Sequence, residues 1–115
     1  CSSLNLEALS DNLIEIGYDA FMACTSLALT TLPNKLKRIN DRAFRGCTSL
    51  ALTALPESLV YIGMMAFRNC PALRLTTLPR SLEHIDNFAF KQCSETVQDL
   101  ERAWHALHTN QHNVL

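Results

Sequence analysis

The chain has 115 residues, of which 48% are hydrophobic and 18% are charged, and its formal net charge is −1 at pH 7. This length is enough for one domain with its own hydrophobic core, and the composition excludes an intrinsically disordered chain. The near-neutral charge argues against a general nucleic-acid binder, and no apolar run approaches the roughly 20 residues that a membrane-spanning helix needs.

Cysteine recurs every 23 residues from Cys1 to Cys93, and several apolar residue types keep the same interval. The columns with this period include Leu27, Leu50 and Leu73; Leu29, Leu52 and Leu75; Ile39, Ile62 and Ile85; and Phe44, Phe67 and Phe90. A constant interval at so many positions is the signature of a repeat architecture. Each repeat cannot bury its apolar side alone, so we expect successive coils to stack and to bury one another's apolar side chains.

Within one repeat, the sequence predicts two short parallel strands, around Leu50–Leu55 and Leu59–Ile62. Pro56 separates them, because proline has no N–H group for a strand ladder. The residue after the isoleucine suits a tight turn with positive φ. It is Gly17, Asn40, Gly63 or Asp86 in the four copies. The following Ala-Phe pair is predicted to end a short helical or 3₁₀ turn that places the phenylalanine inside.

The segment from Leu55 to Gly63, followed by the segment from Ala66 to Cys70, resembles the BspA-type (treponemal-type) leucine-rich repeats. The resemblance extends from Cys1 to Cys93. It implies a curved, mostly β solenoid used for adhesion, host contact or other protein binding, and it implies no catalytic residue. The predicted fold is a right-handed leucine-rich-repeat coil over residues 1–93, with four units and the start of a fifth.

The sequence departs from the family pattern at two neighbouring positions. The family usually places a polar residue five after the cysteine and an aliphatic residue six after it, whereas this chain has Leu29-Thr30, Leu52-Thr53 and Leu75-Thr76. Either the backbone adjusts so that these leucines point inward, or the leucines form an exposed apolar stripe on the concave face. We favour the first alternative, because an inward threonine would need a buried hydrogen-bond partner. The exposure of Leu52 distinguishes the two.

Residues 94–108 are predicted to form an amphipathic helix that caps the last coil, with Ser94 or Thr96 as its N-cap. Its apolar face consists of Val97, Leu100, Trp104 and Leu107. We expect Trp104 to lie over Phe90 and Leu82, and a partner-binding helix is the alternative. Residues 109–115 are predicted to be a polar tail.

The opposite end is predicted to lack a cap, because the sequence begins at Cys1 in the middle of a repeat. We interpret the sequence as a fragment. Either further coils precede it, or another molecule covers the first coil, which includes end-to-end self-association.

The five cysteines are predicted to form a buried ladder of free, apolar thiols. Stacked side chains point the same way, which strains a disulfide, and zinc requires ligands that converge on one point. Cys1 and Cys93, at the two ends, are expected to be the most reactive.

His105, His108 and His112 could share a helix face and hold a metal ion weakly, but polar surface is the favoured interpretation. No cofactor is expected. Localisation stays open, since the resemblance suggests the cell surface or secretion whereas unpaired thiols also fit the cytosol.

We therefore expect a non-catalytic module that binds another protein, with no nucleic acid and no membrane insertion. The residues predicted to contact the partner project outward from the Leu-rich segments or form a basic line after the phenylalanines. They are Ala28, Thr31, Ala51, Thr53, Ala54, Arg74, Thr77, Arg45, Arg68 and Lys91. A structural spacer or stalk in a larger surface or secreted protein is the alternative. The outward pairs Ile14-Glu15, Lys37-Arg38, Val60-Tyr61 and Glu83-His84 differ from copy to copy, which favours recognition over a spacer.

Overall fold

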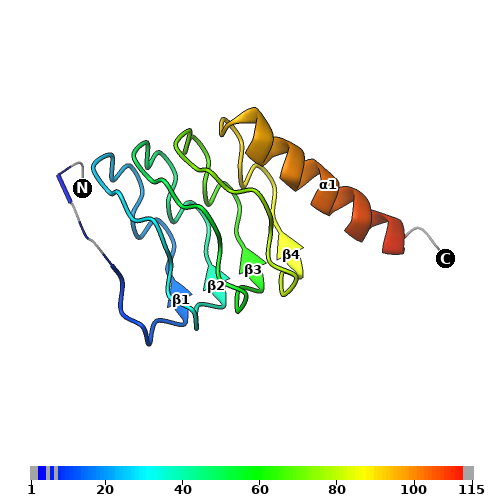
Figure 1. Ribbon diagram of the computed structural model, residues 1–115, viewed down its shortest axis with the longest axis horizontal. Coiled ribbons are helices and arrows are strands. Elements are labelled where there is room, and N and C mark those ends of the chain that lie inside the picture. The colour runs from blue at the N-terminus through cyan, green and yellow to red at the C-terminus, as the bar shows by residue number, and fades with distance from the viewer. Residues whose placement is uncertain (1–2, 5, 7, 113–115) are drawn as a thin grey trace.

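The chain winds into a stack of open coils with a helix at one end, as the computed structural model describes it for residues 3–4, 6 and 8–112 (Figure 1). The molecule measures 49 × 29 × 23 Å along its principal axes. Each of four coils contributes one two-residue strand, and the strands are β1 (Glu15–Ile16), β2 (Arg38–Ile39), β3 (Tyr61–Ile62) and β4 (His84–Ile85). Helix α1 (Glu95–His112) follows the last coil.

The strands form one parallel sheet in the order β1-β2-β3-β4, with equivalent residues of neighbouring repeats as partners. Ile16 is opposite Ile39, Ile39 is opposite Ile62, and Ile62 is opposite Ile85. In every strand the isoleucine points into the core and the residue before it points outward. The predicted stacking of 23-residue units in register is confirmed.

The core consists of the columns that the repeat predicts. The rings of Phe21, Phe44, Phe67 and Phe90 stack in a continuous pile, with centroid separations of 5.4, 5.3 and 5.3 Å. Leu52 is 0% exposed, whereas Thr53 is exposed. The leucines therefore point inward and the threonines outward, which confirms the first of the two alternatives.

Within the described residues, each coil has one strand instead of the predicted two. The segment Leu50–Leu55 forms no strand, because Leu50, Leu52 and Leu55 all point inward while Thr53 and Ala54 are both exposed. A strand requires strict alternation of its two faces, and the three-residue step from Leu52 to Leu55 breaks it. The second predicted strand shortens to Tyr61–Ile62.

The segment around each buried phenylalanine is a series of turns, so the prediction of a helical or 3₁₀ turn is wrong. Alternate N–H groups leave the coil: Phe44 N donates to Ala66 O of the next coil at 2.8 Å, whereas Arg45 N donates to Arg42 O at 3.2 Å. A helix would direct every one of these groups along its own axis. The bonds to the next coil prevent that.

The positions predicted to have positive φ are also wrong. Positive φ occurs two residues later, at Arg42, Met65 and Phe88, and again just before the cysteines. Gly63 is needed for another reason: a Cβ there would lie 2.6 Å from Asp41 N and 2.8 Å from Asn40 C, in the preceding coil. The glycine therefore lets two backbones approach closely.

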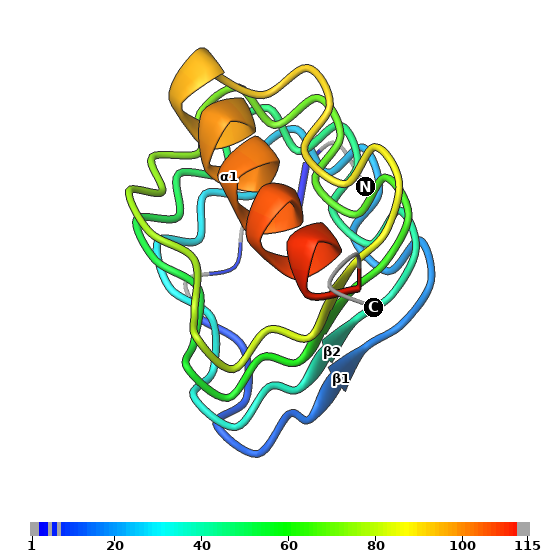
Figure 2. The same cartoon turned by 90° about the vertical axis from the view of Figure 1, so that its right-hand side faces the viewer.

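Helix α1 crosses the open end of the stack (Figure 2). Ser94 is its N-cap, since Val97 N donates to Ser94 Oγ at 3.4 Å, and Thr96 lies inside the helix. Val97 is 1% exposed and belongs to the core, and Leu100 and Trp104 pack against that core. The contact of Trp104 with Phe90 and Leu82 stays a prediction.

The C-terminal half of α1 diverges from the last coil (Figure 1). Leu107 is 66% exposed, so its predicted place on the buried face is wrong. The backbone continues as a helix to His112, four residues beyond the predicted end at His108. Adding a residue to an existing helix costs little, because each one also adds a backbone hydrogen bond. In the part of the chain that the structure describes, no helix is both long and apolar enough to span a membrane.

Candidate functional site

The outward residues of the sheet form a continuous row, here called the strand row: Glu15, Arg38, Tyr61 and His84. Each member contacts the next. Arg38 Nε lies 3.7 Å from Glu15 Oε1, and the guanidinium carbon of Arg38 lies 4.1 Å from the ring centroid of Tyr61. The rings of Tyr61 and His84 stack at 5.1 Å and are nearly parallel. These contacts hold four different side chains in one line.

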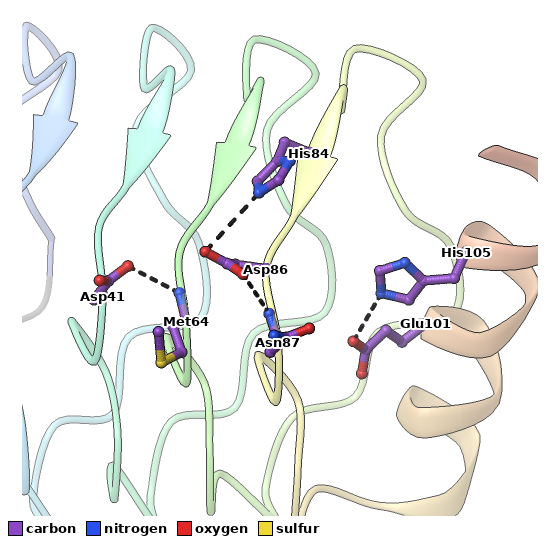
Figure 3. A network of polar contacts seen from close by, with 7 residues as sticks. All are labelled: Asp41, Met64, His84, Asp86, Asn87, Glu101 and His105. Carbon is purple, nitrogen blue, oxygen red and sulfur yellow. Dashed lines mark hydrogen bonds and ion pairs between the residues drawn. The ribbon is translucent and has the colours of Figure 1, made fainter. Parts of the chain in front are cut away.

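The strand row presents hydrogen-bonding groups of different kinds. Burial, together with the carboxylates of Asp41 and Asp86, raises the pKa of Tyr61, so its hydroxyl stays neutral at physiological pH. His84 Nε2 lies 3.9 Å from Asp86 Oδ2 (Figure 3). The strand row therefore presents a carboxylate, a guanidinium, a phenol and an imidazole in succession.

The polar groups beyond the strand ends stabilise the turns and do not form a metal centre. Asp41 Oδ1 accepts a hydrogen bond from Met64 N of the next coil at 2.9 Å, and Asp86 Oδ1 accepts one from Asn87 N at 2.8 Å (Figure 3). On α1, His105 Nε2 pairs with Glu101 Oε2 at 3.1 Å. Among the side chains described here, no three His, Cys, Asp or Glu residues gather closely enough to hold a metal ion. The side chain of His112 lies outside them.

The predicted contact residues of the Leu-rich segments lie at equivalent positions of successive coils. Six are exposed and Ala51 is half-buried; the six are Ala28, Thr31, Thr53, Ala54, Arg74 and Thr77. A shallow hollow of about 370 Å³ lies between Arg74 and the start of α1 at Ser94 and Thr96. Apart from Arg74, these side chains are small and uncharged, so this side of the solenoid is accessible but offers few charged or strongly hydrogen-bonding groups.

The structure also brings together the predicted basic line. Arg45, Arg68 and Lys91 occupy successive coils, and backbone bonds connect the coils at this level, such as Gly46 N to Arg68 O at 2.8 Å. In the described part of the chain, none of these three cations forms an ion pair. The nearby Arg42 pairs with Asp19 at 2.7 Å. A surface with three cations on successive coils and no ion pair among them is locally positive.

Apolar side chains lie beside these cations. Arg68 Nη1 is 3.2 Å from Met65 Sδ, and Lys91 Nζ is 4.8 Å from the ring centroid of Phe88. Met65 and Phe88 have φ values of 56° and 61°, a conformation that costs about 1–2 kcal/mol for a residue with a side chain and that Asn or Gly adopts more readily. Backbone preference therefore does not explain why an exposed phenylalanine occupies this turn.

The buried cysteines have a role that the sequence did not indicate. Cys47, Cys70 and Cys93 each donate a hydrogen bond from Sγ, at 3.0 Å, to the carbonyl oxygen of a phenylalanine in the preceding coil. The acceptors are Phe21 O, Phe44 O and Phe67 O respectively. A thiol is the smallest apolar side chain that also supplies such a donor.

Burial suppresses the reactivity of these thiols. It raises the pKa of Cys47 and of Cys93 to about 11 and raises that of Cys70 as well. Cys93 is 8% exposed, so it is buried like Cys47 and Cys70, and the expectation that it is among the most reactive cysteines stays a prediction. The expectation of an all-thiol ladder is wrong at Cys24, which is disulfide-bonded. Cys1 lies outside the described residues.

The leucine-rich coils stack in register, and a helix crosses one end of the stack. This architecture defines the class of protein as a leucine-rich-repeat solenoid. A family model described as BspA type Leucine rich repeat region (6 copies) matches residues 1–101. The chain therefore belongs to this family, as the sequence resemblance predicted. Searches of curated proteins and of solved structures each gave no match.

Proposed function

We propose that the chain is a non-catalytic protein-binding module. The observation that carries this proposal is the strand row, in which four different side chains project from four equivalent positions of a repeated frame. The core needs identical residues in each coil, but the outside does not. A succession of acid, guanidinium, phenol and imidazole is suited to recognising a partner.

The contacts within the row support the proposal energetically. Arg38 lies between Glu15 and Tyr61, and Tyr61 lies between Arg38 and His84. Side chains that are already held in place lose less conformational entropy on binding. The proposed contact surface also includes the Leu-rich-side residues and the basic line named above.

Selection of peptides from a display library tests this function. The target is the immobilised 115-residue chain, and the counter-target carries Arg38→Ala, Tyr61→Ala and His84→Ala. We expect enriched peptides that bind the native chain and lose about tenfold or more in affinity for the counter-target. A variant with Lys35→Ala, Ser49→Ala and Arg80→Ala, three exposed residues outside the proposed contact surface, is the matched control. Circular dichroism checks that all three proteins are folded.

A spacer is the second candidate, and a specific observation favours it. The Leu-rich side repeats small residues from coil to coil, with threonine at position 30 and its equivalents and Thr31, Ala54 and Thr77 beside them. A spacer has no need of chemical variety on its surface. Failure of the selection to enrich any peptide over a blank surface would leave the spacer as the better account.

Self-association through the first coil stays a prediction, because Cys1 and several neighbouring residues lie outside the described part of the chain.

A further inference from the structure

We propose that the turns after the strands bind an acidic protein segment that also carries apolar side chains. The surface, here called the turn ridge, consists of the cations Arg45, Arg68 and Lys91 together with Met22, Met65 and Phe88. This inference rests on the proposed function and names the class of partner.

Charge is the first argument. The whole chain has a net charge of −1, yet three cations occupy successive coils of the turn ridge and form no ion pair within the described residues. The ring centroids of Phe44 and Phe67, which directly precede two of these cations in the chain, are 5.3 Å apart, and this distance approximates the spacing of successive coils. Like charges at such spacing repel one another. A row of carboxylates from a partner removes that repulsion and supplies the missing counter-charges.

The apolar members are the second argument, and they distinguish a protein segment from a simple polyanion. Phe88 is 53% exposed and Met22 is 40% exposed, so both present apolar surface beside the cations. A phosphodiester chain would use the cations and leave these groups in water. Lys91 Nζ lies over the Phe88 ring, so that face is not free to stack against a nucleic-acid base.

Rigidity is the third argument. Backbone hydrogen bonds join each coil to the next at the cations, from Ala23 N to Arg45 O at 2.7 Å and from Asn69 N to Lys91 O at 2.8 Å. The contacts of Arg68 with Met65 and with Gln92 Oε1 at 3.4 Å hold its head group. A surface that is already ordered in the free protein loses little entropy on binding.

The test measures fluorescence anisotropy of a labelled synthetic peptide in which glutamates alternate with leucine and phenylalanine. The 115-residue chain is titrated into this peptide, into the same peptide with glutamine in place of glutamate, and into a single-stranded oligodeoxynucleotide of similar length. The ridge variant is Arg45→Glu with Arg68→Glu. The control variant is Lys35→Glu with Arg80→Glu, two exposed cations away from the ridge. Each pair changes the charge by −4, from −1 to −5, so non-specific electrostatics are matched.

We expect the acidic peptide to bind the native chain and the control variant alike, and to bind the ridge variant about tenfold or more weakly. Phe88→Asn should also weaken binding while leaving the fold intact, because asparagine tolerates positive φ. Equal losses in both charge variants, or binding of the glutamine peptide or of the oligonucleotide as tightly as the acidic peptide, would overturn the inference. If the library selection yields peptides that depend on the strand row while the acidic peptide fails, the ridge inference falls and the proposed function stands.

Discussion

Replacing Phe67 by alanine should destabilise the solenoid far more than the same change at Phe21. Phe67 is fully buried, and other phenylalanine rings stack on both of its faces at 5.3 Å. Removing such a side chain leaves a cavity and two broken ring contacts, at a cost of about 4 kcal/mol in the free energy of unfolding. Phe21 is half-buried and, among the described residues, its ring stacks on that of Phe44 alone, so its loss should cost about 2 kcal/mol.

Urea unfolding followed by far-UV circular dichroism measures both changes. The single tryptophan, Trp104 on α1, gives a second signal from the capped end of the stack. Coupling between neighbouring coils predicts that the two signals shift together. Phe67→Leu, which keeps apolar volume but removes the stacking, should be intermediate. If Phe67→Ala costs no more than Phe21→Ala, the reasoning from the stacked column is refuted.

Three further changes test individual contacts. Gly63→Ala should lower the free energy of unfolding by about 2 kcal/mol or more, because the new Cβ would overlap the backbone of Asn40 and Asp41. Gly17→Ala is the control and should be harmless, since a Cβ there meets nothing within 4 Å. Equal urea midpoints for the two variants would contradict the close-approach argument. Ser94→Ala should cost about 1 kcal/mol by removing the cap of α1, while Thr96→Ala should change little, and the reverse order in thermal unfolding would reassign the cap. The folded-state pKa values of about 11 for Cys47 and Cys93 exceed the ordinary 9.0, so the unfolded chain releases these protons first and stability should fall as pH rises from about 9 to about 11. A urea midpoint that does not fall over that range, relative to a Cys47→Ala and Cys93→Ala control, would argue against protonated thiols in the folded state.

The side-chain columns could be read from the sequence because a stack of coils repeats its requirements. Each buried position of one coil faces the equivalent position of the next, so Phe44 and Phe67 have the same environment and the same residue type. The inward direction of Leu52 followed from the cost of burying threonine. The helix over the open end followed from the spacing of Val97, Leu100 and Trp104.

The backbone details could not be read in the same way, because hydrogen bonds between coils decide them. The alternate N–H groups around Phe44 bond to the next coil, and nothing in a single repeat indicates which ones do. The hydrogen bond from Cys70 Sγ to Phe44 O joins residues 26 apart in the chain, and the 23-residue spacing of the cysteines does not indicate it. Leu107 keeps the helical period, but α1 has diverged from the last coil at that point.

In the sequence, the strand row was visible only as different residue types at one repeated outward position. The outward residues Arg38, Tyr61 and His84 recur at the interval of the repeat, but the sequence does not reveal that they touch. The strands place them one rung apart, where a guanidinium, a phenol ring and an imidazole stack. A cationic or aromatic residue at the same outward position of three successive repeats is the signal that could have identified the row.

Ring-to-ring nuclear Overhauser effects among specifically labelled phenylalanines test the register of the coils most directly. The stacked column predicts strong cross-peaks between Phe21 and Phe44, between Phe44 and Phe67, and between Phe67 and Phe90, whose centroids are 5.3–5.4 Å apart. It predicts none between Phe21 and Phe67, which lie two coils apart. Absence of the Phe44–Phe67 cross-peak would contradict the in-register stack on which both proposed surfaces depend.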